Sequence, residues 1–279
     1  MRRTLVLTAL AVIGLLFVRA GAVTDGTVDG TRHPAVVLIL MEIDGQPAYR
    51  CSGTLLSATV VVTAGHCTSD FPDAPYSGIR VFIESDVQAG IGTTNNYPFA
   101  GPNAIEAASF AAHPLFETAP FVLHDVGVIV LESPGLVLAP GQYGVLPSVN
   151  MLDDLKTRRG QYDQTFTAVG YGLQKSFPTA VAYKDSRLKT RYMATPHLLQ
   201  INVPGFTGDF SMLLSNNAST GGTCFGDSGG PNFLGSGPSE TNIIAGVTSF
   251  GINGNCAGTG GVFRLDRQDV LDFVNSYLE

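Results

Sequence analysis

A serine lies within a dense run of small residues, Gly226-Asp227-Ser228-Gly229-Gly230-Pro231. Glycine neighbours leave a hydroxyl reachable, and they let backbone N–H groups face the oxyanion that forms when the hydroxyl attacks a carbonyl carbon. A glycine-rich surface turn would also explain these glycines. The chemical interpretation needs a general base elsewhere in the chain, because a hydroxyl is a weak nucleophile at neutral pH.

The same string satisfies Gly-x-Ser-x-Gly, the nucleophile elbow of α/β-hydrolases. That fold places an acid and then a histidine after the serine. Here all five histidines precede Ser228, at positions 33, 66, 113, 124 and 197. An elbow also leads into a helix, which Pro231 would break. Chain order therefore excludes the α/β-hydrolase interpretation.

His66 follows the apolar run Val60-Val61-Val62 and precedes Cys67. A histidine at the end of a strand is often only structural, but together with the serine string it is a candidate general base. Its imidazole would take the serine proton and return it to the leaving amine. A disulfide between Cys51 and Cys67 would close a short loop around it, worth about 3 kcal/mol in the chain-entropy model.

Asp125 opens a second apolar run, Val126 to Leu131. A carboxylate rarely begins a buried strand without a partner, and a catalytic imidazole needs one to fix its tautomer and orientation. A strand-capping aspartate is the alternative.

The four cysteines, Cys51, Cys67, Cys224 and Cys256, suggest two disulfides in an oxidising compartment, with three connectivities open. Zinc ligation is the weaker alternative because the usual ligand spacings are absent. Glu84 and Asp86 are candidate calcium ligands, but a calcium site needs six or more oxygens and a solvated strand end explains them better. We therefore expect no metal and no other cofactor.

Short apolar runs separated by Gly, Pro, Asn or Asp indicate an all-β fold. We expect two antiparallel six-stranded β-barrels, at about 34–132 and 161–264, joined by a linker at about 133–160. A C-terminal helix at about 266–278 is predicted by apolar residues at helical spacing. Asp266 is its candidate N-cap.

Arg2 and Arg3 precede the apolar run 5–18, and Ala20-Gly21-Ala22 then offers a cleavage site, which is typical of a secretory signal peptide at 1–22. A membrane anchor is the alternative, but fourteen residues fall short of the roughly 20 that a spanning helix needs. Removal of 1–22 changes the formal charge from −7 to −10, from 13 basic and 23 acidic residues. An acidic chain is a poor partner for nucleic acid.

Three strings resemble the signature segments of the trypsin/chymotrypsin family of serine peptidases, in the order His, Asp, Ser: Thr63–Cys67, Asp125–Leu131 and Gly226–Pro231. Further matches are His113-Pro114, 169–172 and 247–251. The resemblance covers 23 to the C-terminal helix and implies the chymotrypsin-like fold. The chain departs from the family in having no tryptophan, with Phe250 where tryptophan is usual.

The resemblance also implies roles for individual residues. His66, Asp125 and Ser228 would form the catalytic triad, and the N–H groups of Gly226 and Ser228 would form the oxyanion hole. Ser249 would lie beside Asp125 and border the substrate backbone. Cys224 would pair with Cys256.

The family's selecting residue lies six positions before the nucleophile, which is Gly222 here. With Gly251 and Gly261 as further wall positions, the resemblance implies a deep, open and uncharged pocket. We expect cleavage after large apolar or aromatic residues and not after Arg or Lys.

Activation in the family uses a new N-terminal amine that pairs with the aspartate before the serine, which is Asp227 here. The matching segment begins at Val23, directly after Ala22. We therefore expect signal peptidase itself to free the Val23 amine.

The sequence thus predicts a secreted, monomeric serine endopeptidase that acts on polypeptides, with no stable membrane association. A catalytically silent homologue that binds partners through the same fold is the alternative, and an esterase that uses the same triad is a weaker third option.

Overall fold

The computed structural model describes residues 23–69, 75–116, 123–155, 163–175 and 188–278. The expected signal peptide at 1–22 lies outside these residues, as does part of the expected linker. Among the described helices, none is long and apolar enough to cross a membrane.

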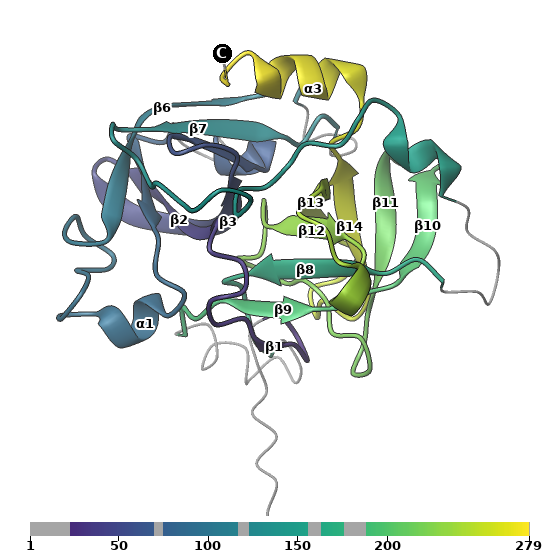
Figure 1. Ribbon diagram of the computed structural model, residues 1–279, viewed down its shortest axis with the longest axis horizontal. Coiled ribbons are helices and arrows are strands. Elements are labelled where there is room, and N and C mark those ends of the chain that lie inside the picture. The colour runs from purple at the N-terminus through teal and green to yellow at the C-terminus, as the bar shows by residue number, and fades with distance from the viewer. Residues whose placement is uncertain (1–22, 70–74, 117–122, 156–162, 176–187, 279) are drawn as a thin grey trace, which may run out of the picture.

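The first half of the chain is a closed barrel in the order β2-β3-β4-β7-β6-β5 (Figure 1). All its pairings are antiparallel. Its strands are β2 (Val36–Ile43), β3 (Gln46–Leu55), β4 (Val60–Thr63), β5 (Gly78–Phe82), β6 (Ala104–Ala112) and β7 (Gly127–Leu131), with a short helix α1 (Val87–Gly90) after β5.

The second half is an antiparallel sheet of eight strands in the order β1-β9-β8-β12-β13-β14-β11-β10. Its strands are β1 (Thr27–Val28), β8 (Phe166–Gly170), β9 (Tyr192–Ala194), β10 (Leu198–Val203), β11 (Gly208–Asn216), β12 (Pro231–Leu234), β13 (Ile244–Gly251) and β14 (Gly258–Arg264). A six-stranded barrel was expected here. The described strands instead form an open, curled sheet, and the N-terminal segment adds β1 to its edge beside β9.

Strand β2 shows why the two halves form one body. Its first six residues are apolar and buried on both faces, and successive side chains of a strand point to opposite sides. Val37, Ile39 and Met41 pack with other residues of the first half. Val36, Leu38 and Leu40 belong to a cluster that also contains residues of the second half, such as Val169, Phe233 and Val247. The interface between the halves is thus a continuous apolar core.

The C-terminal helix α3 (Gln268–Asn275) starts later and ends earlier than the sequence predicts. Asp266 is not its N-cap, because the buried Asp266 carboxylate binds the buried Arg264 guanidinium at 2.7 Å and accepts the Leu152 N–H. The helix lies along the top of the molecule beside the barrel (Figure 1). Its Asp269 carboxylate lies 3.0 Å from Nε2 of His124, the residue before Asp125.

Three single-turn 3-10 helices complete the described elements: η1 (Gly65–Cys67), η2 (Met151–Asp154) and η3 (Gly237–Ser239). The first carries His66 and therefore belongs to the site described next.

Candidate active site

His66 lies directly after β4, in the 3-10 turn η1. The Cys51–Cys67 disulfide joins this turn to β3. The turn carries no side chain at Gly65 because a Cβ there would come within 2.9 Å of the Phe116 ring. The imidazole is thereby held on a rigid barrel edge, with 20% of its side chain exposed.

The Asp125 carboxylate is fully buried and faces His66. Nδ1 of His66 lies 3.1 Å from Oδ1 and 3.0 Å from Oδ2 of Asp125, and the His66 backbone N–H donates to Oδ1 at 3.0 Å. The Ser249 hydroxyl donates to Oδ2 at 2.5 Å. Both carboxylate oxygens thus have hydrogen-bond partners, which a buried charge requires.

The two partners shift each other's titration. Burial lowers the pKa of His66, but the charge and hydrogen bond of Asp125 raise it, and the net pKa lies above the ordinary value. Burial raises the pKa of Asp125, but His66 and the Ser249 hydroxyl lower it, and the net pKa lies below the ordinary value. At neutral pH the Asp125 carboxylate is ionised and makes the His66 imidazole more basic. A more basic imidazole suits the role of general base.

Ser228 lies in a turn that packs against the barrel edge next to His66. The Ser52 N–H donates to the Ser228 carbonyl at 2.8 Å, and Gly229 N–H donates to Thr248 at 2.8 Å. Gly229 has φ +77°, and a Cβ on it would meet the Thr63 hydroxyl at 1.9 Å. The second glycine of the string is therefore needed for this close approach.

The N–H groups of Gly226 and Ser228 donate no hydrogen bond within the described residues, whereas the N–H of Asp227 between them donates to Cys224 at 3.0 Å. The Phe225 carbonyl accepts from the Leu173 N–H at 2.9 Å. Because a trans peptide unit points its C=O and N–H in opposite directions, this bond turns the Gly226 N–H away from Leu173. The two free N–H groups are what an oxyanion hole requires.

Asp227 is fully buried beneath this turn. Its carboxylate accepts the N–H of Gly172 at 2.7 Å and that of Cys224 at 2.9 Å. A Cβ on Gly170 or Gly172 would come within 2.4 Å of the carboxylate, which explains both glycines of the 169–172 match. Burial raises the pKa of Asp227 to about 7, against the lowering effect of its hydrogen bonds and of Arg50.

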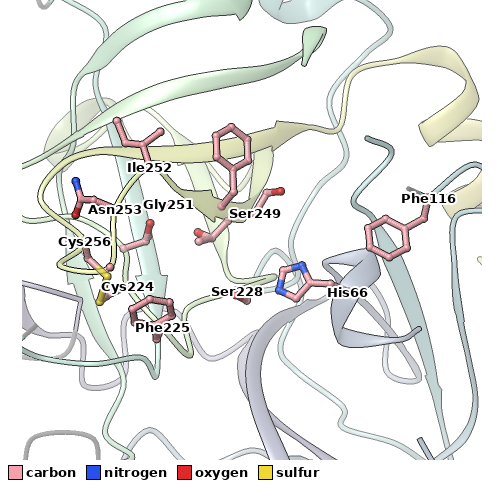
Figure 2. Close-up of a pocket in the computed structure, with 14 residues that line it drawn as sticks. His66, Phe116, Cys224, Phe225, Ser228, Ser249, Gly251, Ile252, Asn253 and Cys256 are labelled. Atoms are coloured by element: carbon pink, nitrogen blue, oxygen red, sulfur yellow. A yellow bond between two sulfur atoms is a disulfide. The ribbon is translucent and has the colours of Figure 1, made fainter. Parts of the chain in front are cut away.

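A cavity of about 540 Å³ opens beside Ser228 and His66 (Figure 2). The side chains of Phe225, Ile252 and Asn253 line it, together with Ser249, Gly251 and Thr223. Apart from His66, no titratable side chain is among its lining residues within the described chain. The Cys224–Cys256 disulfide lies at the end of the cavity away from His66 (Figure 2).

The family model for trypsin matches residues 26–270, which is most of the sequence. The chain belongs to the trypsin family. A solved structure described as HL collagenase resembles it with a TM-score of 0.65 at 19% identity, over 91% of this chain and 98% of that one. The chymotrypsin-like fold is thereby confirmed. A search of curated proteins finds no match to the sequence.

As a trypsin-family protein with this fold, the chain is a serine endopeptidase. The structure brings the predicted His66, Asp125, Ser228 and Ser249 to one place. It also contains the Cys51–Cys67 disulfide expected around His66 and the Cys224–Cys256 disulfide that the resemblance implies. No hydrogen bond of the Ser228 hydroxyl is found among the described residues; the hydroxyl and the imidazole line the same cavity.

Gly222 and Gly261 lie outside the lining of this cavity. A Cβ on Gly261 would come within 2.3 Å of the Phe250 ring. A Cβ on Gly222 would meet the Asn216 side chain at 2.2 Å. Because neither glycine has a side chain, the Phe250 ring occupies the space beside Gly261, and the Asn216 side chain occupies the space beside Gly222.

Asn216 is buried and holds the segment around Gly222 in place. Its amide donates to the Thr223 carbonyl at 2.8 Å, and its Oδ1 accepts from the Thr24 hydroxyl at 2.7 Å. Thr24 and Gly222 form an isolated antiparallel bridge. Sequence reasoning missed Asn216, because its place behind Gly222 depends on β11 and not on any motif.

The sequence also gave no role to Phe225, which is 58% exposed at the cavity rim. The only available signal was its position next to the glycine-rich string.

Val23, the predicted first residue of the mature chain, is fully buried against Tyr192 and Ala194. It directly precedes Thr24, which forms the bridge with Gly222.

The remaining candidate ligands have other partners. Cys51, His66 and Cys67 lie close enough to hold a metal, but both sulfurs belong to the disulfide. Glu84 binds the side chains of Thr94, Asn95 and Asn103, and Asp86 caps α1 through the Ala89 N–H at 3.0 Å. These acids order the loop after β5.

Proposed function

We propose that this serine endopeptidase cleaves peptide bonds through an acyl-enzyme formed on Ser228. His66 Nε2 takes the hydroxyl proton as Oγ bonds to the carbonyl carbon, and it returns that proton to the amine as the C–N bond breaks. Water then repeats the two proton transfers and releases the acid. The buried Asp125 carboxylate, bonded to both His66 and Ser249, is the observation that carries this assignment.

The oxyanion that develops at the carbonyl oxygen is bound by the N–H groups of Gly226 and Ser228. Their lack of other acceptors among the described residues supports this role. Preorganised donors of this kind are worth about 10²–10³ in kcat each.

The residue before the scissile bond enters the cavity beside Ser228, along the backbone of Ser249 and Gly251. Phe225 and Ile252 make its wall apolar, and none of the described residues that line it has a carboxylate that could pair with Arg or Lys. A large apolar or aromatic side chain is therefore preferred. In this scheme Gly222 and Gly261 act indirectly, by admitting Asn216 and Phe250.

The chain is secreted, and cleavage after Ala22 frees the Val23 amine to pair with Asp227. The burial of Val23 and the bridge between Thr24 and Gly222 support an N-terminus that enters the second half of the molecule. An ammonium there would compensate the buried Asp227 carboxylate, whose pKa is about 7 without one. The mature protein acts as a monomer on polypeptides.

Labelling of the purified mature protein with a fluorophosphonate tests the assignment, because only an assembled site makes the serine reactive. We expect stoichiometric labelling of Ser228 and cleavage of a casein substrate, both lost in Ser228→Ala. A folded protein that neither labels nor cleaves would instead be a silent homologue, and ester hydrolysis without peptide cleavage would indicate an esterase.

A further inference from the structure

The backbone turns sharply at Asp125. The Val126 N–H donates to the carbonyl of His124 at 2.7 Å, two residues earlier, so Asp125 lies at the centre of a three-residue turn. His124 enters this turn with φ +50°, a left-handed conformation that is uncommon for residues other than glycine. Such a conformation persists only where the surrounding structure holds it. The direction of the Asp125 carboxylate toward His66 therefore depends on what fixes His124.

The His124 ring is held by side chains from three other parts of the chain. Its Nε2 lies 3.0 Å from an oxygen of the Asp269 carboxylate on α3. The centre of the Phe210 ring lies 4.6 Å from that of His124. The His113 ring stacks on it at 4.9 Å, with 12° between the ring planes. Only 13% of the His124 side chain is exposed, so its position is closely defined.

His113 closes the same group from the other side of the turn. Its N–H donates to the Val126 carbonyl at 2.8 Å, and its Nδ1 accepts the Leu115 N–H at 3.1 Å. An imidazole nitrogen that accepts a hydrogen bond carries no proton. Burial and then His124 lower the pKa of His113, against a raising effect of Asp269. The His113 ring is therefore neutral at neutral pH and stacks on His124 without charge repulsion.

Helix α3 contacts both histidines from one face. Asp269 and Phe273 are four residues apart and therefore lie on the same side of the helix. The Asp269 carboxylate meets His124, and the Phe273 ring meets His113 edge-on with 5.1 Å between the ring centres. The helix, which lies beside the barrel (Figure 1), thus packs on the turn that carries the triad carboxylate. None of these four residues lines the cavity beside Ser228.

We propose that Asp269 is a positioning residue of the triad: through His124 it holds the backbone turn that aims the Asp125 carboxylate at His66. This inference rests on the proposed function, in which Asp125 fixes the orientation of the imidazole. The docking of α3 is thereby coupled to the chemical step and not to substrate binding, because the contact lies away from the cavity. Loss of the Asp269 contact should therefore lower kcat and leave KM unchanged.

The test compares alanine variants of two acids on α3. Asp269→Ala removes the acceptor that faces His124, and we expect kcat on a Phe-containing peptide to fall about fivefold at unchanged KM. Asp272→Ala is the matched control. Asp272 is exposed on the same helix and accepts a hydrogen bond from Gln268, so this variant loses the same charge and should keep the wild-type kcat. Asp269→Asn retains an acceptor oxygen and should recover most of the lost activity. Urea unfolding verifies that each variant is folded in the assay.

A double-mutant cycle shows whether the effect passes through His124. His124→Asn removes the imidazole but suits a positive φ, because asparagine adopts this conformation more readily than most residues. In this background Asp269→Ala should no longer change kcat.

Three results would overturn the inference: an Asp269→Ala enzyme that keeps the wild-type kcat, an equal loss in Asp272→Ala, or a loss that persists in the His124→Asn background. A higher KM at unchanged kcat would overturn it as well. In all these cases the wild-type chain still labels with fluorophosphonate and cleaves peptide, so the peptidase assignment stands. A folded wild-type chain that neither labels nor cleaves would instead reject the proposed function.

Discussion

Asp125 and Ser249 belong to opposite halves of the molecule, and the Ser249 hydroxyl donates to Oδ2 of Asp125 at 2.5 Å. The same carboxylate oxygen lies 3.0 Å from Nδ1 of His66. The orientation of the imidazole therefore depends on how the two halves pack.

Asp125→Asn should lower kcat by about 10⁴-fold, because an amide no longer fixes the imidazole tautomer. Ser249→Ala should cost less, about tenfold, since it removes one hydrogen bond to a charged group. Steady-state kinetics on a Phe-containing peptide measure both. Ser109→Ala, an exposed serine of β6, is the control. A Ser249→Ala enzyme with unchanged kcat/KM would argue against the role given to this hydroxyl.

The activity of the enzyme should rise with pH through the pKa of His66, because only the neutral imidazole accepts the serine proton. Burial lowers this pKa but Asp125 raises it further, so the midpoint of the acid limb in kcat/KM should lie above 6.5. In Asp125→Asn the residual activity should show a midpoint at lower pH. An unshifted midpoint in that variant would contradict the electrostatic coupling of the pair.

Gly222→Asp alone should not create cleavage after Arg or Lys. Its Cβ would meet Asn216 at 2.2 Å, so the variant should lose roughly 1–3 kcal/mol of unfolding free energy through overpacking. Adding Asn216→Gly should recover part of that stability and let the carboxylate project into the freed space. Urea unfolding and the ratio of Arg to Phe cleavage test this prediction. Tryptic activity at wild-type stability in the single variant would refute it.

An extra alanine before Val23 should reduce kcat/KM by on the order of 10²-fold or more, because it moves the amine away from Asp227 and leaves a buried carboxylate unpaired. The comparison requires two chains, one starting at Val23 and one at the added alanine, each verified by N-terminal sequencing. Equal activity of the two chains would show that the Val23 amine is dispensable.

The free energy of unfolding should fall as pH rises above 6.5, in part through His33. Its ring contacts Asp29 through Nδ1 and Glu240 through Nε2, the latter at 2.9 Å. Burial lowers the pKa of His33, but these carboxylates raise it, and the net pKa is raised. Its contribution is thus complete below pH 6.5 and is lost as pH passes the folded-state pKa.

His33→Gln should flatten this part of the pH profile in urea unfolding. In a chain whose Val23 amine is not free, the pKa of Asp227 is raised to about 7, and this carboxyl also makes the protein less stable as pH rises from 3.8 to 7. Because Asp227 is present in both proteins, the difference between their profiles isolates His33. Parallel profiles would mean that the His33 ring does not bind its proton more tightly in the folded state.

Much of the fold could be predicted because local patterns of apolar residues in the sequence specify it. Apolar runs such as Val60–Thr63 and Gly127–Leu131 are strands in the structure, and their burial follows from their composition. Eight strands form the sheet of the second half where six were predicted, and one of the eight, β1, has two residues and no pattern of its own. The N-cap of α3 was mispredicted because Arg264 provides a stronger partner for Asp266 than the helix N-terminus does.

The sequence by itself determined the chemistry that this protein carries. The types of His66, Asp125 and Ser228, their order and the small residues around the serine exclude an α/β-hydrolase and indicate the trypsin family, because those features depend on local backbone requirements. The tertiary structure alone decided that Asn216 fills the space behind Gly222 and that Asp269 of α3 meets His124. These contacts join segments far apart in the chain, and only the packing of the two halves fixes which side chains share one surface.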